Sequence, residues 1–472
     1  MSEVGLSHIN PCIEARREPQ TSTSSRNSRA QENQADTYEV EAQLTDEELR
    51  HTPHEEVEQA NLPQADGGRD AWLFLTGCFM IEALVWGFPF SFGVFQEYYS
   101  KLELFEGQSS GIAVIGTSAS GVMYLGAPLV FFILHSWPHL RRYSGIVGLA
   151  IITLALIASS FANAVWQLIL TQGVLYAIGG ALLYAPTILY LDEWFIAKKG
   201  FAFGVMWGGT GASGVIVPLV MSWGLSKYGF RTMLRVWALT LIILAGPLNF
   251  YVKPRIPLNS YSATTRRRTS WAFLKRPVFL VLQASNILES FGFFVPGVYL
   301  PSYARTLGMS TLAGSSSIVL LNATSVLGQI GLGYLIDRLH VTTVIMISTV
   351  GATLSVFMLW GFSVSVPVLF LFALAYGLFA GGFTAIYTGV IKEVQKHDQF
   401  AETGTIFGLL AAGRGIGAVS SGPISEALLG PEPWKGVSQF GYGSGYGVLI
   451  VFTGVSALLG GISFVGRRVK AI

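Results

Sequence analysis

Long apolar stretches alternate with short polar segments along most of this chain. From about residue 70 onward, mainly apolar runs of roughly 20 residues recur, which is the length that a helix needs to cross the hydrocarbon core of a bilayer. The pattern predicts twelve membrane-spanning helices. They cover about 71–95, 110–134, 143–161, 165–191, 200–224, 231–252, 277–300, 312–336, 341–362, 365–391, 403–428 and 444–466. The second, eighth and eleventh runs are the weakest, because Gly, Ser and Thr dilute them.

Residues 1–65 have a different character. They are polar and rich in Glu, Gln, Ser, Thr and Asn, so they cannot bury enough apolar surface to fold alone. They also lack the apolar core of a secretory signal peptide. We therefore predict a disordered cytosolic tail. A regulatory tail is the alternative, with Ser22, Ser24, Ser25 and Ser28 as candidate phosphorylation sites.

The overall composition supports a membrane protein and excludes several other classes. The 472 residues are 51% hydrophobic and 12% charged, whereas a soluble domain has about 25% charged residues. A net charge of +2 without a long basic stripe argues against a nucleic-acid partner. Cys12 and Cys78 form neither a disulfide framework nor a metal-ligand spacing, so we predict no metal and no cofactor.

The basic residues in the loops predict the orientation of the spans. With twelve spans, one set of loops carries 17 lysine and arginine residues and the other set carries five, namely Lys101, Lys227, Arg231, Arg305 and Lys435. The richer side is expected to face the cytosol. We predict a multi-pass protein with both termini in the cytosol, in the plasma membrane or, as an alternative, in the vacuolar membrane.

The spans divide into two similar halves. A polar stretch at 253–276, predicted to be a cytosolic central loop, separates a six-helix half at 66–252 from a second at 277–472. In the first span of each half, an acidic residue precedes a proline by seven positions: Glu82 before Pro89, and Glu289 before Pro296. The fifth spans share a glycine spacing, shown by Gly200, Gly204, Gly209 and Gly211 against Gly404, Gly408, Gly413 and Gly415. Such repeats mark transporters whose substrate site lies between the halves, near the bilayer midplane.

Several local motifs resemble those of a known superfamily. The segment Gly331-Leu-Gly333-Tyr-Leu-Ile-Asp337-Arg338 is similar to the loop motif of the major facilitator superfamily. Asp66-Gly-Gly68 before span 1 and the span 5 segment from Tyr190 through Trp194, Lys198, Lys199 and Gly200 to Gly214 resemble motifs of its monocarboxylate-porter family, fungal type. The resemblance implies an all-α integral membrane protein with the major facilitator fold. It also implies a gating role for Gly333, Asp337, Arg338, Lys198 and Lys199.

Three departures from that family change the expected chemistry. Its proton–monocarboxylate members carry a lysine where this chain has Phe90, and an aspartate and an arginine where it has Ser325 and Gln329. The resemblance therefore does not predict lactate or pyruvate as the substrate.

The charged residues within the spans are the leading functional candidates. A charge at the centre of a bilayer costs roughly 2.5–3.5 kcal/mol on insertion scales, so Glu82, Glu289 and Arg414 require an explanation. We predict Glu82 as a proton-coupling residue, with a structural, hydrogen-bonded glutamate as the alternative. Arg414 is an anchor for an anionic substrate, the partner of Glu82 or Glu289 in an ion pair that joins the halves, or a residue whose side chain snorkels to the membrane interface. Further candidates for substrate binding or coupling are Gln329, Asn322, Tyr184 and Tyr387.

These observations predict a secondary active transporter that works by alternating access. Its substrate is expected to be a small organic solute, an organic anion or a metabolite, and its partners are that solute, protons and the bilayer. Uptake and efflux of a metabolite or toxin both remain open. The alternative of another class is a non-transporting membrane sensor. The chain has no Gly-x4-Gly-Lys-Ser/Thr loop, His-Glu-x2-His or Gly-x-Ser-x-Gly motif, so we predict neither an ATP-driven pump nor an enzyme.

Overall fold

The computed structural model describes residues 62–106, 109–256, 270–431, 434–437 and 439–468. Residues from Pro63 onward form one compact unit. Residues 1–61 of the predicted tail and the Arg266–Arg268 part of the central loop lie outside the described residues.

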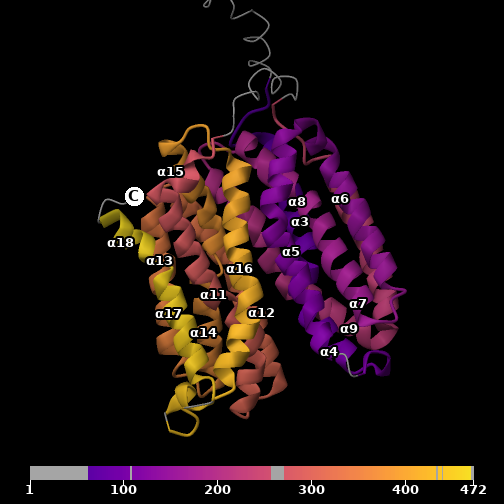
Figure 1. The fold of residues 1–472 in the computed structure, drawn as a ribbon, viewed down its shortest axis with the longest axis vertical. Coiled ribbons are helices and arrows are strands. Elements are labelled where there is room, and N and C mark those ends of the chain that lie inside the picture. Colours follow the sequence, from indigo (N-terminus) through magenta and orange to yellow (C-terminus); the bar gives the residue numbers. More distant parts are fainter. Residues whose placement is uncertain (1–61, 107–108, 257–269, 432–433, 438, 469–472) are drawn as a thin grey trace, which may run out of the picture. The chain divides into compact units, whose positions relative to one another are not determined.

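The N-terminal half consists of long, nearly parallel helices (Figure 1). Two of its spans are interrupted, the first between α3 and α4 and the fourth by a π-helical segment, η2. The bounds are α3 Gly68–Phe90, α4 Phe92–Ser100, α5 Ser109–Ser136, α6 Pro138–Ser159, α7 Val165–Leu168, η2 Ile169–Leu175, α8 Tyr176–Trp194 and α9 Lys199–Leu248.

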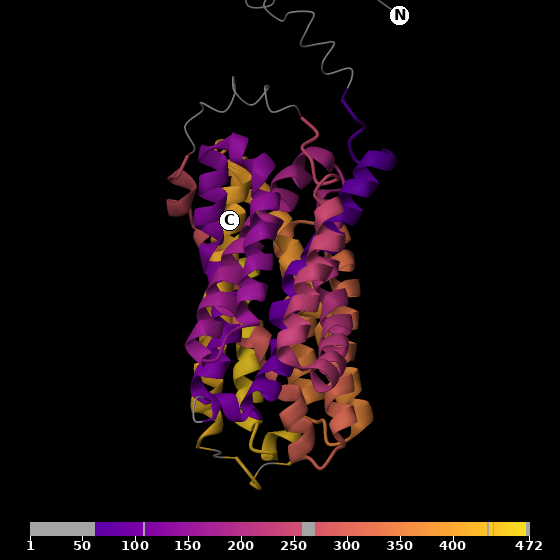
Figure 2. The ribbon, with the colours of Figure 1, turned by 90° about the vertical axis from the view of Figure 1, so that its right-hand side faces the viewer.

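The C-terminal half repeats this arrangement beside the first half, as the turned view in Figure 2 also shows. Its third, fourth and sixth spans are divided into shorter elements. The bounds are α11 Pro277–Thr306, α12 Thr311–Ile336, α13 Val341–Leu354, the π-helical η4 Ser355–Trp360, α14 Val366–Phe379, the 3₁₀ turn η5 Phe383–Ile386, α15 Tyr387–His397, α16 Thr403–Leu429, α17 Gly447–Leu459 and α18 Ile462–Arg468.

Each of the twelve predicted spans lies on helix in the structure. Among the described residues, ten helices are long and apolar enough to cross a membrane. One of them, α9, holds two predicted spans, which meet at Gly229, where φ is 74°. A positive φ is readily adopted by glycine. The remaining span is α16, whose Gly and Ser residues lower its hydropathy, as the sequence indicates.

Local chemistry explains where several helices begin. The Ser310 side chain accepts a hydrogen bond from the N–H of Ala313 at the start of α12, and the Glu402 carboxylate accepts one from Thr405 at the start of α16. Pro138 and Pro277 occupy the first positions of α6 and α11, where a missing N–H has no cost. These caps place the ends of the spans at the predicted loops.

The two halves meet through glycine-rich faces of α9 against α12 and of α5 against α16. A Cβ atom on Gly408 would lie 2.9 Å from Cα of Pro128, and one on Gly214 would lie 2.9 Å from Cγ of Asn322. Helices approach closely where residues are small, because lipid gives them no hydrophobic reason to associate. Most of the glycines that repeat between the halves thus lie on the surface where the halves pack, whereas Gly209 and Gly413 face α3 and α11 of their own halves.

One end of this bundle carries the loops at 195–198, 337–340 and 398–402, and we call it the basic end. The contacts between α9 and α12 run from Gly200 beside Asp337 at this end to Gly214 beside Asn322 near the middle of the helices. In Figure 1 the two halves lie together at the basic end and diverge toward the end where α4 lies. The structure therefore represents a state in which the halves are joined at the basic end.

Replacing Gly204 with alanine is expected to destabilise this contact. The new Cβ would lie 3.0 Å from the Gln329 carbonyl carbon, which is backbone and cannot turn away. Overpacking of this kind typically costs ~1–3 kcal/mol, so a thermal-shift assay in detergent should show a lower melting temperature. Gly208→Ala is the matched control, because the nearest atom to its Cβ would be 3.4 Å away. Equal melting temperatures for the two variants would contradict this description of the interface.

Candidate functional site

Glu82 lies in the middle of α3 and is fully buried. The Thr187 hydroxyl on α8 donates a hydrogen bond to Glu82 Oε1 at 3.2 Å. Within the described part of the chain, Glu82 Oε2 and the indole N–H of Trp86, one turn along, have no hydrogen-bond partner, although the indole lies close enough to act on the carboxylate. Glu82 therefore keeps one oxygen free at the centre of the bundle, where it can carry a proton.

An aromatic cluster surrounds Trp86 and joins the halves. The Trp86 ring centroid lies 4.6 Å from that of Tyr124, 5.8 Å from Tyr184 and 6.1 Å from Trp207. The Trp207 ring in turn stacks on Phe407 of the other half, with centroids 6.2 Å apart. We call these five residues the central aromatic cluster. The predicted candidate Tyr184 thus lies in direct contact with the face of α3 that carries Trp86.

Arg414 forms an ion pair with Glu289, with Nη1 3.1 Å from Oε2, and both side chains are buried. Its guanidinium also lies 3.9 Å from the centroid of the Phe293 ring. Glu289 is on α11 and Arg414 is on α16, so both belong to the C-terminal half. The pair therefore links two helices of one half and does not join the halves, which corrects the ion-pair alternative predicted from the sequence.

Tyr387 lies beside this pair. Its hydroxyl donates to Asn286 Oδ1 at 2.8 Å, and the Asn286 amide donates to the Leu410 carbonyl. The hydroxyls of Tyr387 and Tyr124 are both close enough to interact with the charge of Arg414. Tyr124 also contacts Trp86, so it lies between the Glu82 region and the Arg414 pair.

Gln329 supports a break in a helix. The span formed by α14 and α15 is interrupted after Phe379, and the Gln329 amide donates to the Gly381 carbonyl and to Thr384 Oγ1, both at 2.7 Å. Its carbonyl accepts the Ala385 N–H at 3.2 Å. Both amide hydrogens are thus used by backbone and side-chain groups at the break, which positions the segment that leads into Tyr387.

Asn322 contributes to the contact between the halves. Its amide donates to the Gly214 carbonyl at 3.2 Å, from α12 to α9. The structure thus brings Glu82, Tyr184, Glu289, Arg414 and Tyr387 into the central region. It places Asn322 at the interface of the halves and Gln329 at the helix break.

Two carboxylates from different motifs accept hydrogen bonds from backbone N–H groups in the loop before α9 and in its first turn. Asp337 accepts from Gly200 at 2.7 Å and from Phe201 at 2.8 Å, across the two halves. Asp66 accepts from Ile196, Ala197 and Lys198 at 2.8–3.0 Å. Because a helix N-terminus favours negative charge, Asp337 forms a polar connection between the halves at the basic end.

The other predicted motif residues lie around this connection. Gly333 faces Gly200 so closely that a Cβ on either would meet the other's backbone. Lys199 pairs with Asp192 at 2.6 Å, Lys198 is exposed, and the Arg338 guanidinium lies 4.5 Å from the Tyr334 ring centroid. Burial outweighs the two N–H donors and raises the pKa of Asp337. For Asp66, burial acts against the charge, but three N–H donors outweigh it and lower the pKa.

A second connection at the basic end was not predicted from sequence. Glu402 caps α16 and lies 3.5 Å from Nδ1 of His135 at the end of α5, in the other half. Burial acts against the charge of Glu402, but His135 and the Thr405 N–H outweigh it and lower its pKa. The sequence shows that the loop after span 2 lacks the acidic residue of the loop motif. Glu402, which precedes Thr405 by three residues at the start of α16, supplies an acidic group at this contact instead, and its spacing was the available sequence signal.

The fold and the site define a membrane transporter built from two six-helix halves. The family model of the Major Facilitator Superfamily matches residues 75–422, and the chain belongs to this superfamily. The solved structure of the proton:xylose symporter XylE matches with a TM-score of 0.60 and 13% identity, over 82% of this chain and 94% of that one, which shows a shared fold.

Curated fungal proteins are similar over most of their length. An Aspergillus flavus protein described as MFS transporter asaE is 28% identical, covering 85% of this chain and 87% of that protein. The fujikurins efflux protein of Gibberella fujikuroi is 27% identical, covering 85% and 83%. The aspyridones efflux protein apdF of Emericella nidulans is 26% identical, covering 90% and 82%. This chain is accordingly a membrane transporter of small molecules.

Proposed function

We propose that this transporter exports a small organic solute, a metabolite with an acidic group, in exchange for protons. The observation that carries the proposal is the free carboxylate oxygen of Glu82 at the centre of the bundle, next to an aromatic cluster that both halves build. The direction is supported by relatives that are described as efflux proteins and that match over more than four fifths of their length.

Glu82 supplies the coupling step in this proposal. A carboxylate is costly in the hydrocarbon region, and among the described residues Oε2 has no hydrogen-bond partner in this state, although the Trp86 indole lies nearby. A proton that enters from the exterior side neutralises Glu82, and its release at the other side restores the charge. Because the two protonation states contact Thr187 and Trp86 differently, they favour different arrangements of the halves.

Arg414 supplies the recognition of an acidic solute. A guanidinium has five N–H donors, so Arg414 can hold Glu289 through Nη1 and a second carboxylate through other donors. The central aromatic cluster provides flat apolar surfaces for the rest of the solute. The alternative is that the ion pair is purely structural, and transport by a variant that lacks both Arg414 and Glu289 separates the two roles.

The basic end is proposed to face the cytosol, which places the end where the halves diverge on the exterior side. The excess of lysine and arginine in its loops supports this orientation. Both termini would then be cytosolic, and the plasma membrane is the membrane in which efflux leaves the cell. We further propose membership of the monocarboxylate-porter family. The contacts of Asp66 with the loop before α9 support it, because they bring two of its motifs together.

The proposed function is tested by flux. Metabolites in the medium are compared between cells with and without the protein, and a compound that differs is then loaded into proteoliposomes. We expect an imposed proton gradient to drive that compound across the membrane. A protein that binds the compound without moving it would be a sensor and would contradict the proposal.

Asp337→Ala is expected to open the basic end. Loss of a helix cap costs ~1–2 kcal/mol, which shifts a two-state equilibrium by roughly 5- to 30-fold. Spin labels at Ile196→Cys and Leu339→Cys, in a background without Cys12 and Cys78, report the separation of the halves. The variant should populate longer distances. Asp192→Asn is the matched control, because Asp192 pairs with Lys199 within one half. Identical distance distributions for all three proteins would contradict a gating role for Asp337.

A further inference from the structure

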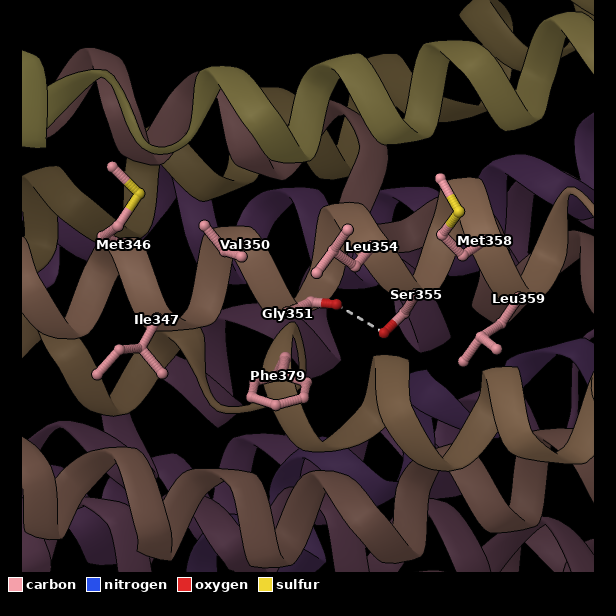
Figure 3. A pocket seen from close by; sticks show the side chains of 9 residues that line it. All are labelled: Met346, Ile347, Val350, Gly351, Leu354, Ser355, Met358, Leu359 and Phe379. Atoms are coloured by element: carbon pink, nitrogen blue, oxygen red, sulfur yellow. Dashed lines mark hydrogen bonds between the residues drawn. The ribbon is translucent and has the colours of Figure 1, made fainter.

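A long apolar groove runs along α13 and η4, with a volume of about 650 Å³ (Figure 3). Met346, Val350, Leu354 and Met358 follow one another at intervals of four residues, so they share one helix face. Phe379, the last residue of α14, lies across the groove from them. The Ser355 hydroxyl is the one polar side chain drawn there, and it donates to the Gly351 carbonyl at 2.6 Å. The groove therefore offers no free polar group to a solute.

This groove lies on the outer surface of the C-terminal half. The helices that pack against α13 are α12, α14, α17 and α18 of the same half. Leu354 is 53% exposed and Met358 is 57% exposed. In a membrane-spanning chain, such side chains face lipid hydrocarbon, so the occupant of the groove is an apolar chain that lies within the bilayer.

Arg467 lies where the groove approaches the basic end, and Arg468 is the next residue of α18. Arg467 on α18 donates from Nη1 to Thr342 Oγ1 at 3.4 Å, and Thr342 is one turn before Met346 on α13. Arg468 follows it, and both arginines are exposed. The guanidinium fork matches the geometry of a phosphate group. Positive charge at one end and apolar surface along the rest is the pattern that a phospholipid requires.

The length of the groove fits a single acyl chain. The 13 steps from Met346 to Leu359 span ~20 Å at the rise of an α-helix. One leaflet contributes roughly 15 Å of hydrocarbon, half of the bilayer core. An acyl chain that enters the groove beside the arginines and stays within one leaflet therefore covers about three quarters of its length, from Met346 to just past Leu354.

We propose that the α13 groove binds one anionic phospholipid, with its phosphate at Arg467 and Arg468 and one acyl chain along Met346, Val350 and Leu354. This site is separate from the transport site and does not rest on the proposed function.

A lipid bound in the α13 groove contacts the end of α14, next to the helix break that Gln329 supports. Phe379 forms one wall of the groove and directly precedes the break, and the Ser348 hydroxyl donates to the Phe379 carbonyl at 2.7 Å. Gly351 has no side chain, which lets the Phe379 ring lie directly against α13. A lipid chain against Phe379 holds α14 on α13 at the point where the span is interrupted.

Native mass spectrometry of the purified full chain tests the site, with phosphatidylserine and phosphatidylcholine added back in turn. We expect one bound phosphatidylserine, held roughly 10-fold more tightly than phosphatidylcholine because of the two arginines. Leu354→Trp and Val350→Trp each fill the groove and should lose the bound lipid. Arg467→Gln with Arg468→Gln should keep one lipid without the preference. Leu371→Trp on α14 is the matched control, because Leu371 is 52% exposed and lies outside the groove, and it should behave as the unchanged protein.

Four results would overturn the proposal. These are the absence of one-to-one binding in the unchanged protein, equal loss of lipid in Leu354→Trp and Leu371→Trp, a preference that survives replacement of both arginines, and a dimer that Leu354→Trp dissociates. The last result would assign the groove to a second copy of the chain. The melting temperature of each variant is measured alongside. If Leu354→Trp fails to fold, Val350→Trp carries the test.

Discussion

Replacing Glu82 with glutamine should abolish transport that is driven by a proton gradient, to the level of liposomes without protein. Glutamine has nearly the same shape but cannot carry the proton that the free oxygen of Glu82 would take. Exchange of labelled for unlabelled solute needs no net proton movement, so it should persist. The measurement is gradient-driven flux and solute exchange in the same proteoliposome preparation.

Two controls make this prediction specific. Glu97 on α4 is exposed and pairs with Lys101 at 2.7 Å, so Glu97→Gln should transport normally. The melting temperature of Glu82→Gln should equal or exceed that of the unchanged protein, because a costly buried carboxylate is removed. Gradient-driven flux that persists unchanged in Glu82→Gln would remove Glu82 from the coupling mechanism.

Replacing Arg414 with leucine should destabilise the protein strongly. The variant leaves Glu289 buried without its partner, and breaking a buried pair in this way costs ~3–5 kcal/mol. The double variant Arg414→Leu with Glu289→Leu should recover most of that loss, since an apolar pair of similar volume is often neutral or stabilising. Thermal or chemical unfolding in detergent measures both effects.

Transport by the double variant distinguishes the two roles of Arg414. If Arg414 anchors an acidic solute, the stable double variant should remain inactive. The milder Arg414→Lys should bind the solute more weakly, because lysine lacks the guanidinium fork. Two results would contradict the anchor role: normal transport by the double variant, or unaltered solute affinity in Arg414→Lys. Either would show that the ion pair has only a structural role.

The spans and the repeat were accessible from the sequence, because lipid imposes length and hydropathy on any helix that crosses it. The matching positions of Glu82 and Glu289 in the first span of each half, together with the shared glycine spacing, predicted the two halves. The join at Gly229 was predicted as a short loop, because Lys227 and Arg231 separate the two apolar runs, but the structure continues helix up to the glycine on both sides.

The partners of the buried groups were not accessible in the same way. The hydrophobic pattern places Glu289 and Arg414 within spans. Which of the two glutamates pairs with Arg414 depends on which helices are neighbours, and the structure shows that it is Glu289. The same limit applies to Gln329, whose amide supports a helix break, and to Glu402, which meets His135 across the halves. Packing determines which distant segments come into contact, whereas the local sequence shows only which groups are able to interact.

Simultaneous measurement of solute and proton movement in one set of proteoliposomes tests the central claim most directly. With the solute inside and an acidic exterior, we predict that protons enter as the solute leaves, at a fixed ratio, and that both movements stop in Glu82→Gln. Solute efflux without any accompanying proton entry would contradict proton-coupled export by this transporter.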